Sequence, residues 1–469
     1  MDLAEQGWYR KSPLFVQNAV VSAHGLYSRV ARGGPSFRRA LAELLESQWF
    51  SEEAFAEIQN ARLAALVEHC YRRVPYYRNV MRERGLSPSD ITTVDDLPKL
   101  PLLTKEDVRT RAAELVREDL GRAPVSIGNT SGTTGTPLRL VRDHPSVVFE
   151  QATIWRHWTI DGLPLWGRRA KLQGDSILPS GANEPPFWRT NAPENQLVMS
   201  SFHISLETAP HYARALRAFA PRAITAYPSS VYFLAKTLLE LDERVEVPLI
   251  FTNSEPVYAK QREVIEEAFS GKVYDVYGQA ERVVYAMECP ERTGLHVAPE
   301  YGVLELVEPE GGDAGGLLEV VGTSLANYAM PLLRYRVGDL ARPLETGCAC
   351  GRKMPLLSGI ETRVSDMILT PEGRQLPFSG MTHAFMGLRH IRKSQLVQDA
   401  VDHIHVKVVP GDAFSEDDRR AMVERITNYV GERVRIDTEL VDEIDRDASG
   451  KFRWIVSKVN PADWMDANG

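Results

Sequence analysis

One short segment of the chain combines small residues and hydroxyl groups at a density that suits anion binding. Residues 129 to 140 read NTSGTTGTPLRL, and seven of the first eight are Ser, Thr or Gly. Glycine removes side-chain bulk, so several backbone N–H groups and hydroxyls of this turn can surround one anion. The segment predicts a polyphosphate cradle, although no Lys-Ser/Thr pair follows its last glycine as in the GxxxxGK[ST] loop. The alternative is a solvated linker, which the flanking apolar residues Ile127, Leu138 and Leu140 disfavour.

Three further polar segments carry groups that would complete such a site. YGQAE ends in Glu281, whose carboxylate offers a hard oxygen ligand for magnesium, and its tyrosine could face a base. YRVGD ends in Asp339, which at the end of a strand can accept two hydrogen bonds from a sugar diol. GKFR contains Lys451, whose charge could stabilise a phosphoryl transition state from a mobile domain. Taken singly, each has a plain alternative: a strand-to-helix turn, a Gly-Asp β-turn and a surface lysine.

Three of the four cysteines and one histidine have metal-ligand spacing. Cys348 and Cys350 form a CxC pair in TGCACGRK, and Cys289 and His296 form Cys-x6-His in ECPERTGLH. Three thiolates and one imidazole would fill a tetrahedral zinc site and leave no position open, which makes the zinc structural rather than catalytic. The alternative is a pair of free loop thiols and an ordinary strand histidine.

The elements around these segments follow an α/β pattern. Residues 1 to about 100 carry helical periodicity, and Thr104 with Asp107 three residues later predicts a capped helix. From about 145 to 340, apolar strand-like runs alternate with helical runs and often end in polar turns, which predicts α/β layers with largely parallel buried strands. Residues from about 300 to 362 predict a β-rich subdomain. The region from 341 to about 380, which overlaps its end, is rich in Gly, Cys and Pro and predicts loops. We expect a large domain over 1–362 and a small mobile α+β domain over 363–469.

The bulk composition excludes several classes of protein. The 469 residues carry a formal net charge of -8, so no basic nucleic-acid surface is expected. Four cysteines argue against a disulfide framework, and the acidic start MDLAEQ against an export signal, so we expect a cytoplasmic protein. The apolar run from 13 to 30 contains Gln17, Asn18, His24 and Arg29, which makes it too polar to span a bilayer. A peripheral membrane contact there stays open.

Together, TSGTTGTP, YGQAE, YRVGD and the C-terminal GKFR resemble the adenylate-forming superfamily of acyl-CoA synthetases. The resemblance is strongest to its phenylacetate–CoA ligase-like branch and covers nearly the whole chain, from VPYYRNVMRERGL to GKFR. It implies an ATP-dependent ligase that joins a carboxylic acid to AMP with release of pyrophosphate. The acyl group then passes to a second nucleophile, most often the thiol of coenzyme A.

The resemblance also assigns roles to single residues. Lys451, Glu281 and Thr134 match catalytic positions: the lysine that contacts the carboxylate and the α-phosphate, the magnesium carboxylate, and a hydroxyl of the phosphate loop. Asp339 matches the ribose-binding aspartate, and Arg363 the arginine at the domain boundary, with Asp366 at the hinge. The remaining matches belong to the phosphate loop, the adenine-packing strand end and the next segment of the nucleotide and acyl pocket: Ser131, Gly132, Thr133, Thr134 and Gly135; Ser254, Glu255 and Pro256; Tyr277 and Gly278.

The sequence leaves the substrates open in several respects. Aromatic residues between 151 and 227 favour an aromatic acid if they line a slot, but they are equally consistent with a core; they are Trp155, Trp158, Phe187, Trp188, Phe202, His203 and Tyr227. An amine, a hydroxyl or a carrier-protein thiol is the alternative acceptor. Leu138, where many relatives have lysine, and Ala280, where a hydroxyl residue is usual, favour a further alternative, a non-catalytic zinc-stabilised nucleotide-binding homologue. The oligomeric state, including a homodimer, also stays open.

Overall fold

The computed structural model describes residues 7–121, 123–129, 138–175, 177–178, 184–201, 203–255, 257–309, 316–363, 367–371, 375–377, 390–445 and 452–459. The chain divides into two compact units. The first consists of Met1–Leu304, Gly322–Tyr335 and Leu344–Leu357, and the second of Glu305–Val321, Arg336–Pro343 and Ser358–Gly469. Four strands have residues in both units: β11 (Gly302–Val307), β12 (Leu318–Ser324), β13 (Tyr335–Leu344) and β14 (Leu356–Arg363).

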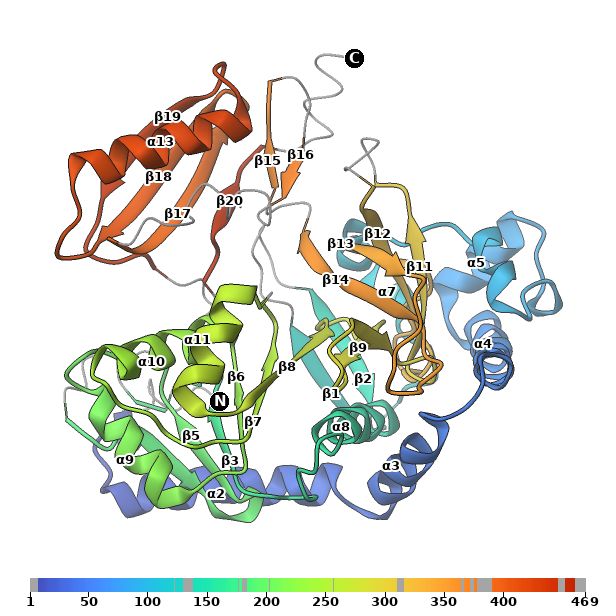
Figure 1. Cartoon of the computed structure of the whole chain (residues 1–469). Helices are drawn as coiled ribbons and strands as arrows, with labels where there is room; N and C mark the ends of the chain where they lie inside the picture. Colours follow the sequence, from blue (N-terminus) through green and yellow to red (C-terminus); the bar gives the residue numbers. More distant parts are fainter. Residues whose placement is uncertain are drawn as a thin grey trace. The chain divides into compact units, whose positions relative to one another are not determined.

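The N-terminal part of the first unit is helical, as the sequence predicts (Figure 1). Thr104 caps its helix through the expected capping box with Asp107. The helices are α1 (Gly7–Arg10), α2 (Leu14–Arg32), α3 (Pro35–Ser47), α4 (Glu52–Arg73), α5 (Pro75–Glu83), α6 (Lys105–Thr110) and α7 (Ala112–Leu115), with 3-10 turns η1 (Pro88–Asp90) and η2 (Val94–Lys99).

A large sheet forms the centre of the first unit. Its strands lie in the order β10-β9-β8-β7-β6-β3-β5-β4. The neighbours from β8 to β5 are parallel, whereas β4, β9 and β10 pair antiparallel. The strands are β3 (Arg169–Leu172), β4 (Trp188–Asn191), β5 (Gln196–Met199), β6 (Ala223–Ala226), β7 (Leu249–Asn253), β8 (Lys272–Gly278), β9 (Tyr285–Glu288) and β10 (Leu295–Val297).

Helices cover both faces of the parallel part, which is why its strands are almost continuously apolar. Ile224, Ile250 and Val273 point into a core with α9 (Ala209–Phe219), α10 (Pro228–Glu240) and α11 (Ala259–Phe269). Their neighbours along the strands face a second core, formed with α3 and α8 (His144–Trp158). A separate hairpin of β1 (Val125–Asn129) and β2 (Arg139–Asp143) precedes α8.

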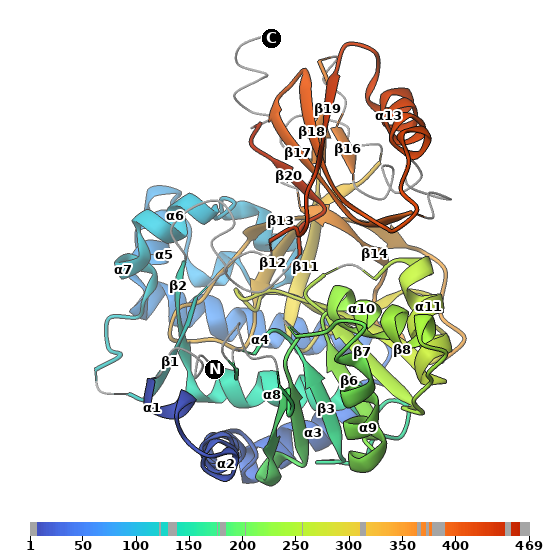
Figure 2. The ribbon, with the colours of Figure 1, turned by 90° about the vertical axis from the view of Figure 1, so that its left-hand side faces the viewer.

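The C-terminal part of the second unit is a small α+β fold. Its sheet has the order β19-β18-β17-β20, and α13 (Glu416–Val430) lies along one face (Figures 1 and 2). These strands are β17 (Ile391–Ala400), β18 (His403–Pro410), β19 (Arg435–Leu440) and β20 (Ile455–Ser457). The region from 341 to about 380 is not only loops, because β13 continues to Leu344 and is followed by β14, β15 (Met367–Leu369) and β16 (Gln375–Pro377). Among the described residues, no helix is both long enough and apolar enough to cross a membrane.

Candidate functional site

The β1–β2 hairpin presents the Ser/Thr/Gly segment. Its arms pair antiparallel from Val125 opposite Asp143 up to Asn129 opposite Arg139. Residues 130 to 137 connect these arms, so the predicted phosphate-loop residues Ser131, Gly132, Thr133, Thr134 and Gly135 lie outside the described residues. Leu138, the first described residue after the loop, is buried, whereas Arg139 is exposed.

Arg142, on the second arm of the hairpin, joins it to the YGQAE segment. Its guanidinium lies over Gly128, where an added Cβ would be 2.3 Å from it, so a larger residue at this position would displace the guanidinium. Arg142 donates a hydrogen bond to the carbonyl of Ala280. Burial, and then the neighbouring charge of Arg282, lowers the pKa of Arg142 to about 10, so it stays charged at neutral pH. A cation is therefore held at the base of the loop.

Glu281 follows β8 in a tight turn. The buried Tyr335 donates from its phenol to Oε1 of Glu281 at 2.9 Å, which orients the carboxylate. Arg282 has φ of +58°, a left-handed conformation that is uncommon for residues other than glycine and is often found at functional sites. Its amide donates to the carbonyl of Gln279 at 3.1 Å. The turn thus holds a carboxylate and a guanidinium on successive residues.

A pocket lies between this turn and the hairpin. Nε of Arg282 is 3.6 Å from Oε1 of Glu150, and Oε2 of the same carboxylate accepts a hydrogen bond from the phenol of Tyr301. Asn327 ties the pocket wall to β2, because its amide donates to the carbonyl of Val141 at 2.9 Å. The pocket is lined by Leu140, Val141, Arg142, Ser146, Glu281, Arg282, Tyr301, Ser324, Ala326, Asn327, Met330 and Leu332. Two arginines, one carboxylate and small polar groups suit a phosphate-bearing ligand with a divalent cation.

The other predicted nucleotide residues of the first unit lie at the ends of neighbouring strands. Ser254 and Glu255 follow β7, and Ser254 has φ of +70°. Tyr277 and Gly278 end β8, which is parallel to β7. Adjacent parallel strands bring their carboxyl ends to the same edge, which is where ligands bind in α/β sheets. Pro256 lies outside the described residues.

Asp339 belongs to the second unit. It is buried inside β13 rather than at a strand end, because the strand continues through Gly338 to Leu344. Burial, and then the charge of Asp339, raises the pKa of Glu319 to about 7. Arg336 pairs with Glu319, with Nε and Oε1 3.0 Å apart. Arg363 ends β14, and its side chain lies outside the described residues, as do Asp366 and Lys451.

Several of the aromatic residues proposed for an acid-binding slot lie in the core. Trp155 is fully buried, and Arg169 lies over its ring and that of Trp158 at 4.5 and 4.9 Å. Phe187 stacks on Tyr212 with ring centroids 5.8 Å apart. The contacts of Trp155, Trp158 and Phe187 therefore favour the core interpretation for these three residues. Phe202 lies outside the described residues.

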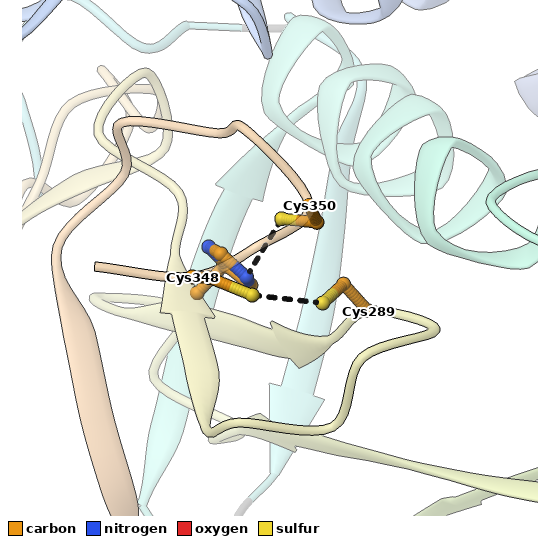
Figure 3. Close-up of side chains that lie close together, drawn as sticks. Cys289, Cys348 and Cys350 are labelled. Atoms are coloured by element: carbon orange, nitrogen blue, oxygen red, sulfur yellow. Dashed lines mark hydrogen bonds between the residues drawn. The ribbon is translucent and has the colours of Figure 1, made fainter. Parts of the chain in front are cut away.

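The predicted metal ligands come together in the first unit (Figure 3). The sulfurs of Cys289 and Cys348 are 3.5 Å apart, as are the sulfur of Cys350 and Nε2 of His296. The four ligand atoms all lie within 4.8 Å of one another. Zinc–sulfur bonds of about 2.3 Å in a tetrahedron put sulfurs roughly 3.8 Å apart, so the donor set and its spacing fit zinc.

Local structure explains how these ligands meet. Cys289 directly follows β9, and His296 lies on β10, which pairs with β9. Cys348 and Cys350 lie in a turn closed by a hydrogen bond from the amide of Gly351, whose φ is +84°. Burial lowers the pKa of His296 to about 4, which keeps its imidazole neutral, as a ligand must be. Burial, with the neighbouring thiols, raises the pKa of Cys289 to about 12.

Next to this turn, Arg352 anchors the segment to the N-terminal helices. Its Nε and Nη2 donate to the side-chain oxygen of Gln48 at 3.1 and 2.8 Å. Its guanidinium also lies 4.4 Å from the centre of the Trp49 ring.

The sequence did not reveal two residues of the pocket, Arg142 and Arg282, or the phenol of Tyr335 that orients Glu281. Gly128, one residue before the end of β1, was a signal for a side chain crossing the hairpin. Arg282 directly follows the recognised glutamate, and Tyr335 opens the recognised YRVGD segment. Their contacts join segments far apart in the chain, which spacing alone does not reveal.

Comparisons with known proteins agree with this architecture. The CapK C-terminal domain family matches residues 368–458. Protein CapK of Staphylococcus aureus is 24% identical over 459 residues, which is 96% of this chain and 99% of that protein. Phenylacetate-coenzyme A ligase of Thermus thermophilus is 26% identical over 69% of this chain and 74% of its own length.

A solved structure has the same fold over most of the chain. The crystal structure of 2-hydroxyisobutyryl-CoA ligase in the postadenylation state superposes with a TM-score of 0.68 at 20% identity, over 90% of this chain and 93% of that one. These relatives and the shared fold support the resemblance of the chain to the adenylate-forming superfamily of AMP-forming ligases. Phenylacetate-coenzyme A ligases are among these relatives, which supports the resemblance to the phenylacetate–CoA ligase-like branch.

Proposed function

We propose that this protein activates a carboxylic acid with ATP and transfers the acyl group to coenzyme A. In the first step, a carboxylate oxygen of the acid attacks the α-phosphorus of ATP, and pyrophosphate leaves. In the second step, the thiol of coenzyme A attacks the acyl carbon, and AMP leaves. The acid is already a competent nucleophile, so the protein has to align the reactants and offset the charge on the phosphates.

The observation that carries this proposal is the pocket between the β1–β2 hairpin and the turn after β8. Glu281, held by Tyr335, would bind magnesium, which supplies charge neutralisation and orientation of the phosphates. Arg142 and Arg282 bring two positive charges to this pocket. Together they would offset the loss of the lysine that Leu138 replaces, and this argues against a non-catalytic homologue.

The remaining roles rest on the sequence match. Thr134 and its neighbours would bind the β- and γ-phosphates, and Asp339 the ribose. Lys451 would contact the carboxylate and the α-phosphate during adenylation. Domain rotation about the region of Arg363 would then remove Lys451, so that one cleft serves both transition states. An aromatic acid is our proposal for the substrate class, supported by phenylacetate-coenzyme A ligases being among the relatives.

Pyrophosphate exchange into ATP, measured with a panel of aryl and alkyl carboxylic acids, tests the first step. We expect exchange with at least one compact aromatic acid, and no exchange with any acid would refute adenylation. AMP formation with and without coenzyme A then identifies the acceptor. Release of AMP that depends on an amine, a hydroxyl compound or a carrier protein instead would replace coenzyme A in the proposal.

The tail lysine can be tested separately from the rest of the site. We expect Lys451→Ala to abolish exchange but to leave the reaction of a supplied acyl-adenylate with coenzyme A largely intact. If both half-reactions survive, the role of the lysine is wrong.

We further propose that Cys289, His296, Cys348 and Cys350 hold a structural zinc ion. Four protein ligands fill a tetrahedral shell, so the zinc would take no part in the ligation chemistry. It would join the β9–β10 hairpin to the turn between β13 and β14, where the chain has few apolar residues to stabilise it. The close approach of the four ligand atoms supports this assignment.

A further inference from the structure

Helix α2 presents an apolar face to solvent. The side chains of Phe15, Tyr27 and Val30 are 73%, 72% and 72% exposed, and Leu26 is 53% exposed. Their spacing puts them on one face together with the exposed Ala19 and Ala23. Trp8, on the short helix before α2, is 55% exposed as well. Exposed apolar side chains gathered on one helix face usually mark an interaction surface.

The opposite face of α2 points into the protein, where Val21 packs on Ile177 and Val198 and several polar side chains form hydrogen bonds. Oδ1 of Asn18 accepts from the amide of Thr190 at 3.0 Å. Oγ of Ser22 donates to the carbonyl of Thr190 at 3.1 Å and accepts from the amide of Ala192 at 3.2 Å. Gln17 is buried and accepts from Nε of Arg189 at 2.6 Å. These polar side chains satisfy groups of β4, at the edge of the large sheet, and of the turn that follows it, while Phe15, Leu26, Tyr27 and Val30 stay exposed (α2 is labelled in Figure 1).

The charge around this face is strongly one-sided. The sequence from Gly7 to Ala42 contains six Lys or Arg residues and no Asp or Glu, although the whole chain has a net charge of -8. Five of the six are exposed: Arg10 and Lys11 before the helix, and Arg32, Arg38 and Arg39 at and after its end. An exposed apolar helix face with aromatic residues and flanking cations is typical of helices that lie in the interface of an anionic bilayer.

We propose that the apolar face of α2 docks on a membrane surface rich in anionic lipid. Phe15, Leu26, Tyr27 and Val30 would enter the headgroup and acyl boundary, while the basic residues at both ends contact lipid phosphates. The structure disfavours a second copy of the chain as the occupant. Twofold pairing of antiparallel α2 helices would bring Arg10 and Lys11 of one copy near Arg32 and Arg38 of the other, where like charges repel.

Vesicle flotation with the full-length protein tests the proposal. We expect it to bind vesicles of phosphatidylcholine with phosphatidylglycerol and to bind pure phosphatidylcholine much less. The double variant Phe15→Ser, Tyr27→Ser should lower the partition coefficient at least about tenfold, because two apolar side chains lose their burial. A matched variant, Leu206→Ser, Leu241→Ser, removes two exposed leucines elsewhere and should bind as the wild type does.

A charge variant and an oligomer measurement complete the test. Arg10→Glu, Lys11→Glu should abolish the preference for anionic vesicles, and all variants should keep the wild-type circular dichroism and thermal midpoint, since every changed side chain is exposed. Absence of wild-type binding, or equal binding to both vesicle types, would overturn the proposal. So would a wild-type dimer that Phe15→Ser, Tyr27→Ser converts to a monomer, because a second copy would then cover the face.

Discussion

Tyr335→Phe isolates the hydrogen bond that orients Glu281. The side chain of Tyr335 is 1% exposed. The substitution keeps its aromatic ring and removes only the hydroxyl group, which donates to the carboxylate of Glu281 at 2.9 Å. Hydrogen bonds to charged groups contribute about 1.5–3 kcal/mol. At about 1.4 kcal/mol per factor of ten, this corresponds to a loss of roughly 10- to 150-fold. If Glu281 holds magnesium, that loss falls on the affinity of the metal–ATP complex.

The assay is pyrophosphate exchange at fixed ATP over a range of magnesium concentrations. We expect the magnesium midpoint of Tyr335→Phe to rise by at least about tenfold, with further magnesium restoring most of the rate. Glu281→Gln should show a larger effect that added magnesium does not restore.

Tyr77→Phe is a matched control for a buried phenol outside the site. Its hydroxyl donates to the carbonyl of Pro331 at 3.1 Å and accepts from the amide of Leu333 at 2.9 Å. Loss of this hydroxyl leaves a buried N–H without its partner, so the free energy of unfolding should fall by about 1–3 kcal/mol. The magnesium midpoint should not move. An unchanged midpoint in Tyr335→Phe, or an equal shift in Tyr77→Phe, would refute the role assigned to Glu281.

Three further predictions concern zinc, a buried ion pair and acid stability. Metal analysis should find about one zinc ion per chain in the wild type and much less in Cys350→Ser, which should also have a lower thermal midpoint. A wild type with well under one zinc ion per chain would contradict the zinc proposal. Nη1 of the buried Arg156 lies 2.9 Å from the carboxylate of Glu300. Glu300→Gln leaves this arginine without its counter-charge and should lower the free energy of unfolding by roughly 3–5 kcal/mol. Denaturant titration measures this loss, and a value below about 1 kcal/mol contradicts the prediction. Burial lowers the pKa of His157 from 6.5 to about 3, so the unfolded chain binds this proton first and stability falls as pH drops from about 6.5 towards 3. His157→Phe should flatten this part of the pH–stability curve, and an unchanged slope contradicts the assignment.

The α/β architecture could be predicted from the sequence because it depends on local signals. Polar turns follow buried strands such as Leu249–Asn253 and Lys272–Gly278, and Thr104 with Asp107 forms a capping box between residues three apart. The metal cluster was also accessible, because its residues are rare types in two short spacings. That these residues bind zinc stays a prediction.

Features that depend on distant packing could not be predicted in this way. Asp339 follows Gly338, a common turn pair, yet tertiary pairing keeps both inside β13. The segment after 341 is rich in turn residues, but Leu356 and Leu357 pair with β10 and form a strand. Trp155 was ambiguous because a core and a ligand slot require the same apolar ring, and only its complete burial decides between them.

The polar contacts of α2 also have a consequence for how much of the chain can be removed. Asn18 and Ser22 occupy hydrogen-bonding groups of β4 that would otherwise be open to another extended chain. A shortened protein that begins after Arg32 would expose that strand, and an open strand edge can recruit the same edge of another molecule. Such a truncation should therefore aggregate by intermolecular β-pairing, even though it removes residues far in sequence from Glu281.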